Sequence, residues 1–137
     1  MWADYLRKMY LIFIFTQIES AVCSGTKTLV DPSGGIDDGY PLRYPNNLYC
    51  GWIIDPPGDD PITIEITYLR TGVGDYVKVY DGGDNTASLI GEFSGYSTSL
   101  IRTSTNGIMF VEFTTDGTNQ KPGFTAQYWV RMYKKYS

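Results

Sequence analysis

The 137-residue sequence contains no histidine and only two cysteines. Without histidine, no imidazole is present to bind a metal or to act as the base of a Ser–His or Cys–His nucleophile pair. Most hydrolase mechanisms are excluded by this absence, and the remaining residue types form no recognisable catalytic set. We therefore expect a protein that is not an enzyme.

Basic residues are also scarce, because 11 Lys and Arg stand against 15 Asp and Glu and the formal net charge is −4. No stretch of the sequence gathers enough Lys and Arg to attract a phosphate backbone, which argues against nucleic acid as a partner. The length is typical of one domain with a single core.

The first 22 residues differ in composition from the rest. Arg7 and Lys8 precede an apolar run at residues 9–15, and a more polar stretch follows at residues 16–21. This order is typical of a secretory signal peptide. The apolar run is shorter than the about 20 residues that span a bilayer. We expect residues 1–22 to be a leader, the protein to be extracellular, and no stable membrane insertion.

Other interpretations of the N-terminus stay open. Cleavage after Ser20 or Ala21 fits the small residues there, and Met9 is an alternative start. The segment is also compatible with a buried first strand, and Cys23 with a lipidation site after a bacterial leader. Secretion would allow Cys23 and Cys50 to oxidise. Closing a loop of this length stabilises a fold by about 3–4 kcal/mol.

From residue 26 onward, short β-prone stretches alternate with turn residues. Ile62, Ile64, Ile66 and Tyr68 alternate with polar residues, which predicts a strand with one buried face and one face exposed to water. Other strands are expected at 27–31, 50–55, 76–80, 88–93, 98–104, 107–114 and 124–131. Residues 32–35 are expected to end the strand at 27–31, and residues 36–49 to form an extended loop. This spacing predicts an all-β sandwich.

Five segments, in order, resemble the CUB domain family: CSGTKTLVDPSGGIDDGYP, YPLRYPNNLYCGWII, GDYVKVYDGG, LIGEFSG and NGIMFVEFTTDGTNQKPGFTAQYWV. The resemblance implies an antiparallel, jelly-roll-like β-sandwich over residues 23–131, with 132–137 as a tail. It also implies a disulfide between Cys23 and Cys50. The second disulfide of most members is missing, because Gly72 and Ser94 occupy its positions.

The same resemblance implies a calcium site in the loops at one end of the sandwich. Tyr44, Asp75, Asp116 and Asn119 match the family's ligand positions. Oxygen ligands from converging loops are what Ca²⁺ requires. The usual Glu is absent, since Thr67 occupies its place, and only two carboxylates remain. In the alternative interpretation, Asp75 and Asp116 bond only to N–H groups of the loops.

Other acidic and basic stretches are expected to be structural. Residues 81–85 predict a hairpin turn rather than a metal loop. The pairs Asp37-Asp38 and Asp59-Asp60 predict solvated turns, because no nucleophile or aromatic cleft accompanies them. The basic, aromatic end of the chain at 131–136 is expected to fray, with a glycan- or phosphate-binding patch as the alternative.

These features predict a secreted, non-catalytic module that binds an extracellular protein or a glycan, with Ca²⁺ as a candidate cofactor. The short chain is similar in extent to single-domain CUB members such as the spermadhesins. A different class of function is also open, namely a self-associating component of an extracellular matrix or coat.

Overall fold

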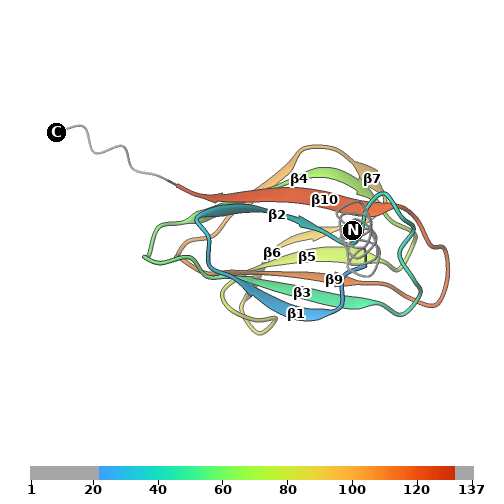
Figure 1. The fold of residues 1–137 in the computed structure, drawn as a ribbon, viewed down its shortest axis with the longest axis horizontal. Helices are drawn as coiled ribbons and strands as arrows, with labels where there is room; N and C mark the ends of the chain where they lie inside the picture. The colour runs from blue at the N-terminus through green and yellow to red at the C-terminus, as the bar shows by residue number, and fades with distance from the viewer. Residues whose placement is uncertain (1–21, 132–137) are drawn as a thin grey trace, which may run out of the picture.

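Ten strands lie in two sheets stacked face to face (Figure 1). The computed structural model describes residues 22–131, so the expected leader and the tail at 132–137 lie outside the described residues. The first sheet contains, in spatial order, β1 (Gly25–Leu29), β3 (Tyr49–Ile54), β9 (Met109–Thr114), β5 (Tyr76–Asp81) and β6 (Ser88–Phe93). The second contains β2 (Ser33–Asp37), β10 (Gly123–Val130), β4 (Ile62–Arg70) and β7 (Tyr96–Ser97), and β8 (Leu100–Thr103) also pairs with β4. The predicted all-β sandwich is confirmed.

Between residues 22 and 131 the chain forms only strands, turns and loops, so this part contains no helix suited to crossing a membrane. Most strand pairs are antiparallel, as expected, but β1 and β3 run parallel, with Gly25 opposite Cys50. The Cys23–Cys50 disulfide lies where these two strands begin, because Cys23 precedes β1 by two residues and Cys50 is the second residue of β3.

The core lies between the two sheets, where alternate residues of each strand point inward. Trp52 from the first sheet packs edge-on against Phe124 from the second, with ring centroids 5.7 Å apart. Phe113 completes this stack, 5.3 Å from Phe124. Large rings that bridge two sheets bury much apolar area with few voids. The inner face of β10 carries Phe124, Ala126 and Tyr128, which are all buried.

The chain does leave the first strand as expected, but the break lies at residues 30–32, because residues 33–37 form strand β2, which pairs along β10. Gly34 faces the ring of Tyr128, and a Cβ there would lie 2.9 Å from the ring. A side chain would therefore collide with the core, and the small residue allows the strand to pair. The strand expected at 98–104 is shorter than predicted, because β8 begins only after Ser99, which has a positive φ.

Candidate functional site: loops at one end of the sandwich

Three loops meet at one end of the sandwich, on the right in Figure 1. They connect β2 to β3, β4 to β5, and β9 to β10. Hydrogen bonds between them fix their meeting point: Tyr44 donates its N–H to the carbonyl of Lys121 at 3.1 Å, and Asn47 donates to the carbonyl of Asp116 at 2.8 Å. The sequence-predicted ligand residues all lie in these loops.

Asp75 is the centre of this cluster and is fully buried. Its Oδ2 accepts a hydrogen bond from the Tyr44 hydroxyl at 2.5 Å, and its Oδ1 accepts one from the Asp116 N–H at 2.8 Å. The Tyr44 hydroxyl in turn accepts the Gly72 N–H at 2.8 Å. Burial first, and then the bond to Asp75, raise the pKa of Tyr44 well above its usual range. The hydroxyl therefore stays protonated as the donor to this carboxylate.

Asp116 and Asn119 complete the cluster from the β9–β10 loop. The side chain of Asp116 is half-buried, and its Oδ1 accepts the Thr118 N–H at 3.0 Å. Asn119 approaches with its backbone carbonyl, which lies 3.5 Å from the Tyr44 hydroxyl, while its side chain is exposed. The structure thus brings Tyr44 and Asp75 together by their side chains, whereas Asp116 contacts Asp75 through its backbone N–H and Asn119 contacts Tyr44 through its backbone carbonyl.

Two glycines allow these loops to approach one another. A Cβ on Gly72 would lie 2.5 Å from the carbonyl oxygen of Asn119. A Cβ on Gly74, whose φ is +89°, would overlap the Asp116 carboxylate. At both positions a side chain would push the β9–β10 loop away from Asp75. The close packing of oxygens around Asp75 depends on these two residues.

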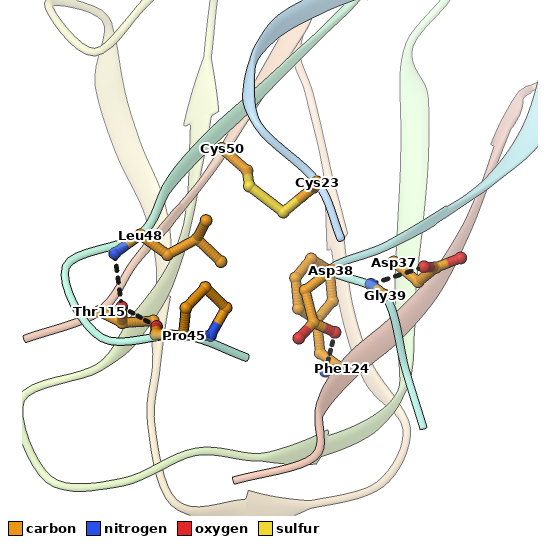
Figure 2. Close-up of a disulfide and its surroundings, with 9 residues drawn as sticks. All are labelled: Cys23, Asp37, Asp38, Gly39, Pro45, Leu48, Cys50, Thr115 and Phe124. Carbon is orange, nitrogen blue, oxygen red and sulfur yellow. Dashed lines mark hydrogen bonds between the residues drawn. A yellow bond between two sulfur atoms is a disulfide. The ribbon is translucent and has the colours of Figure 1, made fainter. Parts of the chain in front are cut away.

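Cys23 and Cys50 form a disulfide with a Cα–Cα distance of 5.9 Å, beside the same loops (Figure 2). At the position where a second bridge is missing, hydrogen bonds take its place. Ser94 Oγ donates to the Gly72 carbonyl at 3.3 Å and lies 3.3 Å from Thr71 Oγ1. This polar link joins the same two chain segments that a disulfide would join.

Asp38 does not match its expected place in a solvated turn, because its side chain is 1% exposed. Its Oδ1 accepts the Phe124 N–H at 3.0 Å (Figure 2), whereas its Oδ2 has no hydrogen-bond partner among the described residues. Burial raises the pKa of Asp38 to about 6. The burial of Asp38 could not be predicted from its neighbours, because its hydrogen-bond partner lies 86 positions along the chain. Asp37, Asp59 and Asp60 are exposed, as expected.

The hairpin turn expected at residues 81–85 is present between β5 and β6, which pair antiparallel. Asp84 accepts a hydrogen bond from the Thr86 N–H at 2.9 Å, which is typical of a turn aspartate. Asp81 bonds to Thr105 in a neighbouring loop. Both side chains are thus engaged in holding loops.

A model of the CUB domain matches residues 23–128 of the sequence. The chain belongs to the CUB domain family. It is 33% identical over 118 residues to the bone morphogenetic protein 1 homolog of Strongylocentrotus purpuratus, covering 79% of the chain and 18% of that protein. It is 32% identical over 143 residues to neuropilin-2 of Rattus norvegicus, covering 93% of the chain and 15% of that protein. The chain thus spans less than a fifth of the length of these two relatives.

Among solved structures, the MASP-1 CUB2 domain bound to Ca²⁺ superposes with a TM-score of 0.68. The two sequences are 20% identical, and the match covers 79% of this chain and the whole of that domain. At this identity the similarity supports the CUB fold alone and does not identify the ligands of this chain.

The loop cluster of this CUB domain offers oxygen donors only, which suits a hard cation such as Ca²⁺. Both oxygens of Asp75 accept hydrogen bonds, but a carboxylate oxygen keeps a second lone pair for a metal. Charge is the weak point. Glu65 bonds to Ser99 and Thr67 bonds to Thr125, so neither adds to the cluster. No three His, Cys, Asp or Glu side chains converge anywhere in residues 22–131. The cluster therefore offers oxygen groups from three loops and contains two aspartates.

Proposed function

We propose that this CUB domain is an extracellular, non-catalytic interaction module whose loop end binds Ca²⁺ and contacts a partner protein. The observation that carries the proposal is the convergence of Tyr44, Asp75, Asp116 and the Asn119 carbonyl from three separate loops. A bound ion would be coordinated by residues of all three loops and would link them. The ion bound to the MASP-1 CUB2 domain, a member of the same family, gives support by analogy.

The surface around the cluster favours a protein partner there. Val73, between the two glycines, is 83% exposed, and Leu42 in the β2–β3 loop is 55% exposed. Apolar side chains at loop tips, next to a carboxylate cluster, suit a partner that presents a basic side chain with apolar neighbours. In this arrangement the acidic cluster receives the basic group, and Val73 and Leu42 contact the surrounding apolar area.

Calcium binding is tested best with Asp116→Ala, because the Asp116 N–H that bonds to Asp75 belongs to the backbone and survives the substitution. We expect calorimetry to show binding near about 1 mM, which is typical of extracellular modules. The variant should bind at least about tenfold more weakly, since one of two carboxylates is lost. Asp60→Ala is the matched control, because Asp60 is exposed in the β3–β4 turn. Absence of heat and of a Ca²⁺-induced rise in Tm for the native chain would refute the proposed site.

Partner binding is tested with immobilised full-length protein and extracellular fluid. A partner held by the loop end should be retained with Ca²⁺ and released by a chelator. Val73→Asp should abolish retention, because a charged carboxylate would replace the exposed apolar contact and would have to lose its hydration against the partner's apolar area. Retention that survives both the chelator and Val73→Asp would place the contact elsewhere.

A structural role remains the second candidate, and one feature favours it. Tyr40, Tyr68 and Tyr96 form a row on the second sheet, with ring centroids 4.9 Å and 6.2 Å apart. Tyr96 is 72% exposed. If this row mediates self-association, sedimentation velocity will show oligomers of the native chain that Tyr96→Ser dissociates. A monomer at all concentrations would leave only the binding module.

A further inference from the structure

A hollow of about 370 Å³ lies on the outer face of the second sheet, between β2 and β10. Its lining residues are Ser33, Gly34, Gly35, Gln127, Tyr128 and Trp129. Six positions of β10 separate Trp129 from Gly123, which adjoins the loop cluster. At the rise of a strand this distance is about 20 Å. The hollow therefore lies toward the opposite end of the sandwich from the proposed calcium site, on the left in Figure 1.

Trp129 is the wall of this hollow and is 38% exposed. It alternates with the buried Tyr128, so its indole stands on the outer face of the sheet. Trp129 and Gln127 are both exposed, and an indole N–H and a carboxamide are strong hydrogen-bonding groups. An aromatic face and exposed polar groups thus share one side of the sheet.

Gly35 forms the floor of the hollow, and packing does not require a glycine at this position. A Cβ on Gly35 would meet only the Ala126 carbonyl at an ordinary 3.8 Å, whereas a Cβ on Gly34 would collide with Tyr128. Glycine weakens a strand interior and often marks the close approach of a ligand. Any larger side chain at Gly35 would project into the hollow beside Trp129. Gly35 is therefore explained by the open space and not by the core.

The chemistry of the lining identifies the class of ligand. None of the six lining residues is charged. The charged residues that flank them are of both signs: Asp37 on β2, Glu65 opposite Gln127, and Arg131 two positions after Trp129. The lining itself therefore offers no charged group with which an ionic ligand could pair. A neutral sugar ring has an apolar C–H face that packs against an aromatic ring and hydroxyls that pair with amide and hydroxyl groups. A hollow of this size lies at the small end of ligand sites.

We propose that the hollow binds one neutral pyranose residue, stacked on Trp129 and hydrogen-bonded by Gln127 and Ser33. The site needs no metal, because its lining contains no carboxylate. It goes beyond the proposed function at the loop end and does not depend on it. In a secreted protein, such a site would recognise a neutral sugar of an extracellular glycan.

The test titrates the full chain with methyl β-D-galactopyranoside, methyl β-D-glucopyranoside and methyl α-D-mannopyranoside, each up to about 50 mM, in the presence of EDTA. Binding is followed by the amide and indole signals in NMR spectra. At least one of these sugars should shift the Trp129 indole signal in a saturable manner. N-Acetylneuraminic acid, which is anionic, should bind at least about tenfold more weakly.

Two substitutions test the two parts of the site. Trp129→Ala removes the stacking surface, and Gly35→Val fills the hollow on an edge strand where a β-branched residue is favourable. Each should weaken sugar binding by at least about tenfold, and Gly35→Val should leave the free energy of unfolding unchanged or raised. Tyr96→Ala is the matched control, because it removes an exposed aromatic ring from the same sheet outside the hollow. It should bind sugar as the native chain does.

The result that overturns the proposal is a lack of saturable response to all three sugars, or a response that Gly35→Val leaves intact. A dimer that buries the free edge of β2 would also overturn it, because a second copy would then occupy this face. Loss of calcium binding with retained sugar binding would refute only the proposed function of the loop end. The two proposals therefore fail independently.

Discussion

Two buried aspartates lie at the same end of the sandwich, and their surroundings differ. Asp75 and Asp38 are 0% and 1% exposed. Each oxygen of Asp75 accepts a hydrogen bond, from the Tyr44 hydroxyl and the Asp116 N–H. Asp38 has one such bond, from the Phe124 N–H, and an Oδ2 without a partner. Burial of a carboxylate is tolerable when hydrogen bonds replace water, and it is costly when they do not.

The largest expected effect comes from Asp75→Ala. This substitution leaves the Tyr44 hydroxyl and the Asp116 N–H buried without an acceptor, at about 1–3 kcal/mol each. We expect the free energy of unfolding to fall by about 3 kcal/mol, as measured by urea denaturation. Asp60→Ala should change it by less than about 0.5 kcal/mol. Equal effects of the two substitutions would mean that the network around Asp75 contributes nothing to stability.

Asp38→Asn should raise the free energy of unfolding, whereas Asp75→Ala lowers it. The pKa of Asp38 is raised to about 6 in the folded chain, against 3.8 when unfolded. The folded state therefore binds the proton more tightly, and stability falls as pH rises from about 4 to about 6. Above this window the charged form costs about 2–3 kcal/mol. Asparagine keeps an acceptor for Phe124 and carries no charge, so it should stabilise the chain by about 2 kcal/mol at pH 7.

The measurement for Asp38 is urea denaturation at pH 4 and pH 7. The native chain should gain stability toward pH 4 from this group, and Asp38→Asn should lose that gain. The difference between the two proteins isolates Asp38 from other titrating groups. A native-minus-variant difference that is flat with pH would show that Asp38 is not the group responsible.

The smallest of these effects is expected for Tyr44→Phe, which removes only a hydroxyl. The Gly72 N–H loses its acceptor, and Asp75 keeps one of its two hydrogen bonds. Asp75 would then resemble Asp38, with one oxygen unpaired. We expect the free energy of unfolding to fall by about 1–2 kcal/mol. Urea denaturation would measure this loss, and an unchanged free energy of unfolding would show that the Tyr44 hydroxyl does not stabilise the loops.

The sequence predicted the sandwich because its signals are local. Alternating isoleucines in 62–68 and the spacing of turns depend on neighbours along the chain, and the segments that resemble the CUB family placed Tyr44, Asp75 and Asp116 in loops. In the structure, Tyr44 and Asp75 meet by their side chains, and Asp116 contacts Asp75 through its backbone N–H. Whether they bind Ca²⁺ stays a prediction for calorimetry.

The failures of prediction have tertiary causes. Strand β2 contains two glycines and has little strand propensity of its own, and it forms because β10 offers a partner along its length. Asp38 looked like a turn residue, since its hydrogen bond to Phe124 joins positions 86 apart. The hollow beside Trp129 also has no local signal. The sequence does not distinguish the two adjacent glycines, Gly34 and Gly35. Only the structure shows that Gly34 packs against Tyr128 and that Gly35 borders the hollow.

The hydrogen bonds between Gly72 and Ser94 have a mechanical consequence. A disulfide between these positions would prevent the segment between them, which spans 22 positions, from being stretched. Hydrogen bonds allow the segment to extend as soon as the sheets separate. The Cys23–Cys50 bridge still withholds 27 positions, or about 90 Å of contour length. Under tension, this domain should therefore lengthen in two stages. The hairpin of β5 and β6 extends when the rest of the fold unfolds. The segment between Cys23 and Cys50 extends only after the disulfide has been reduced.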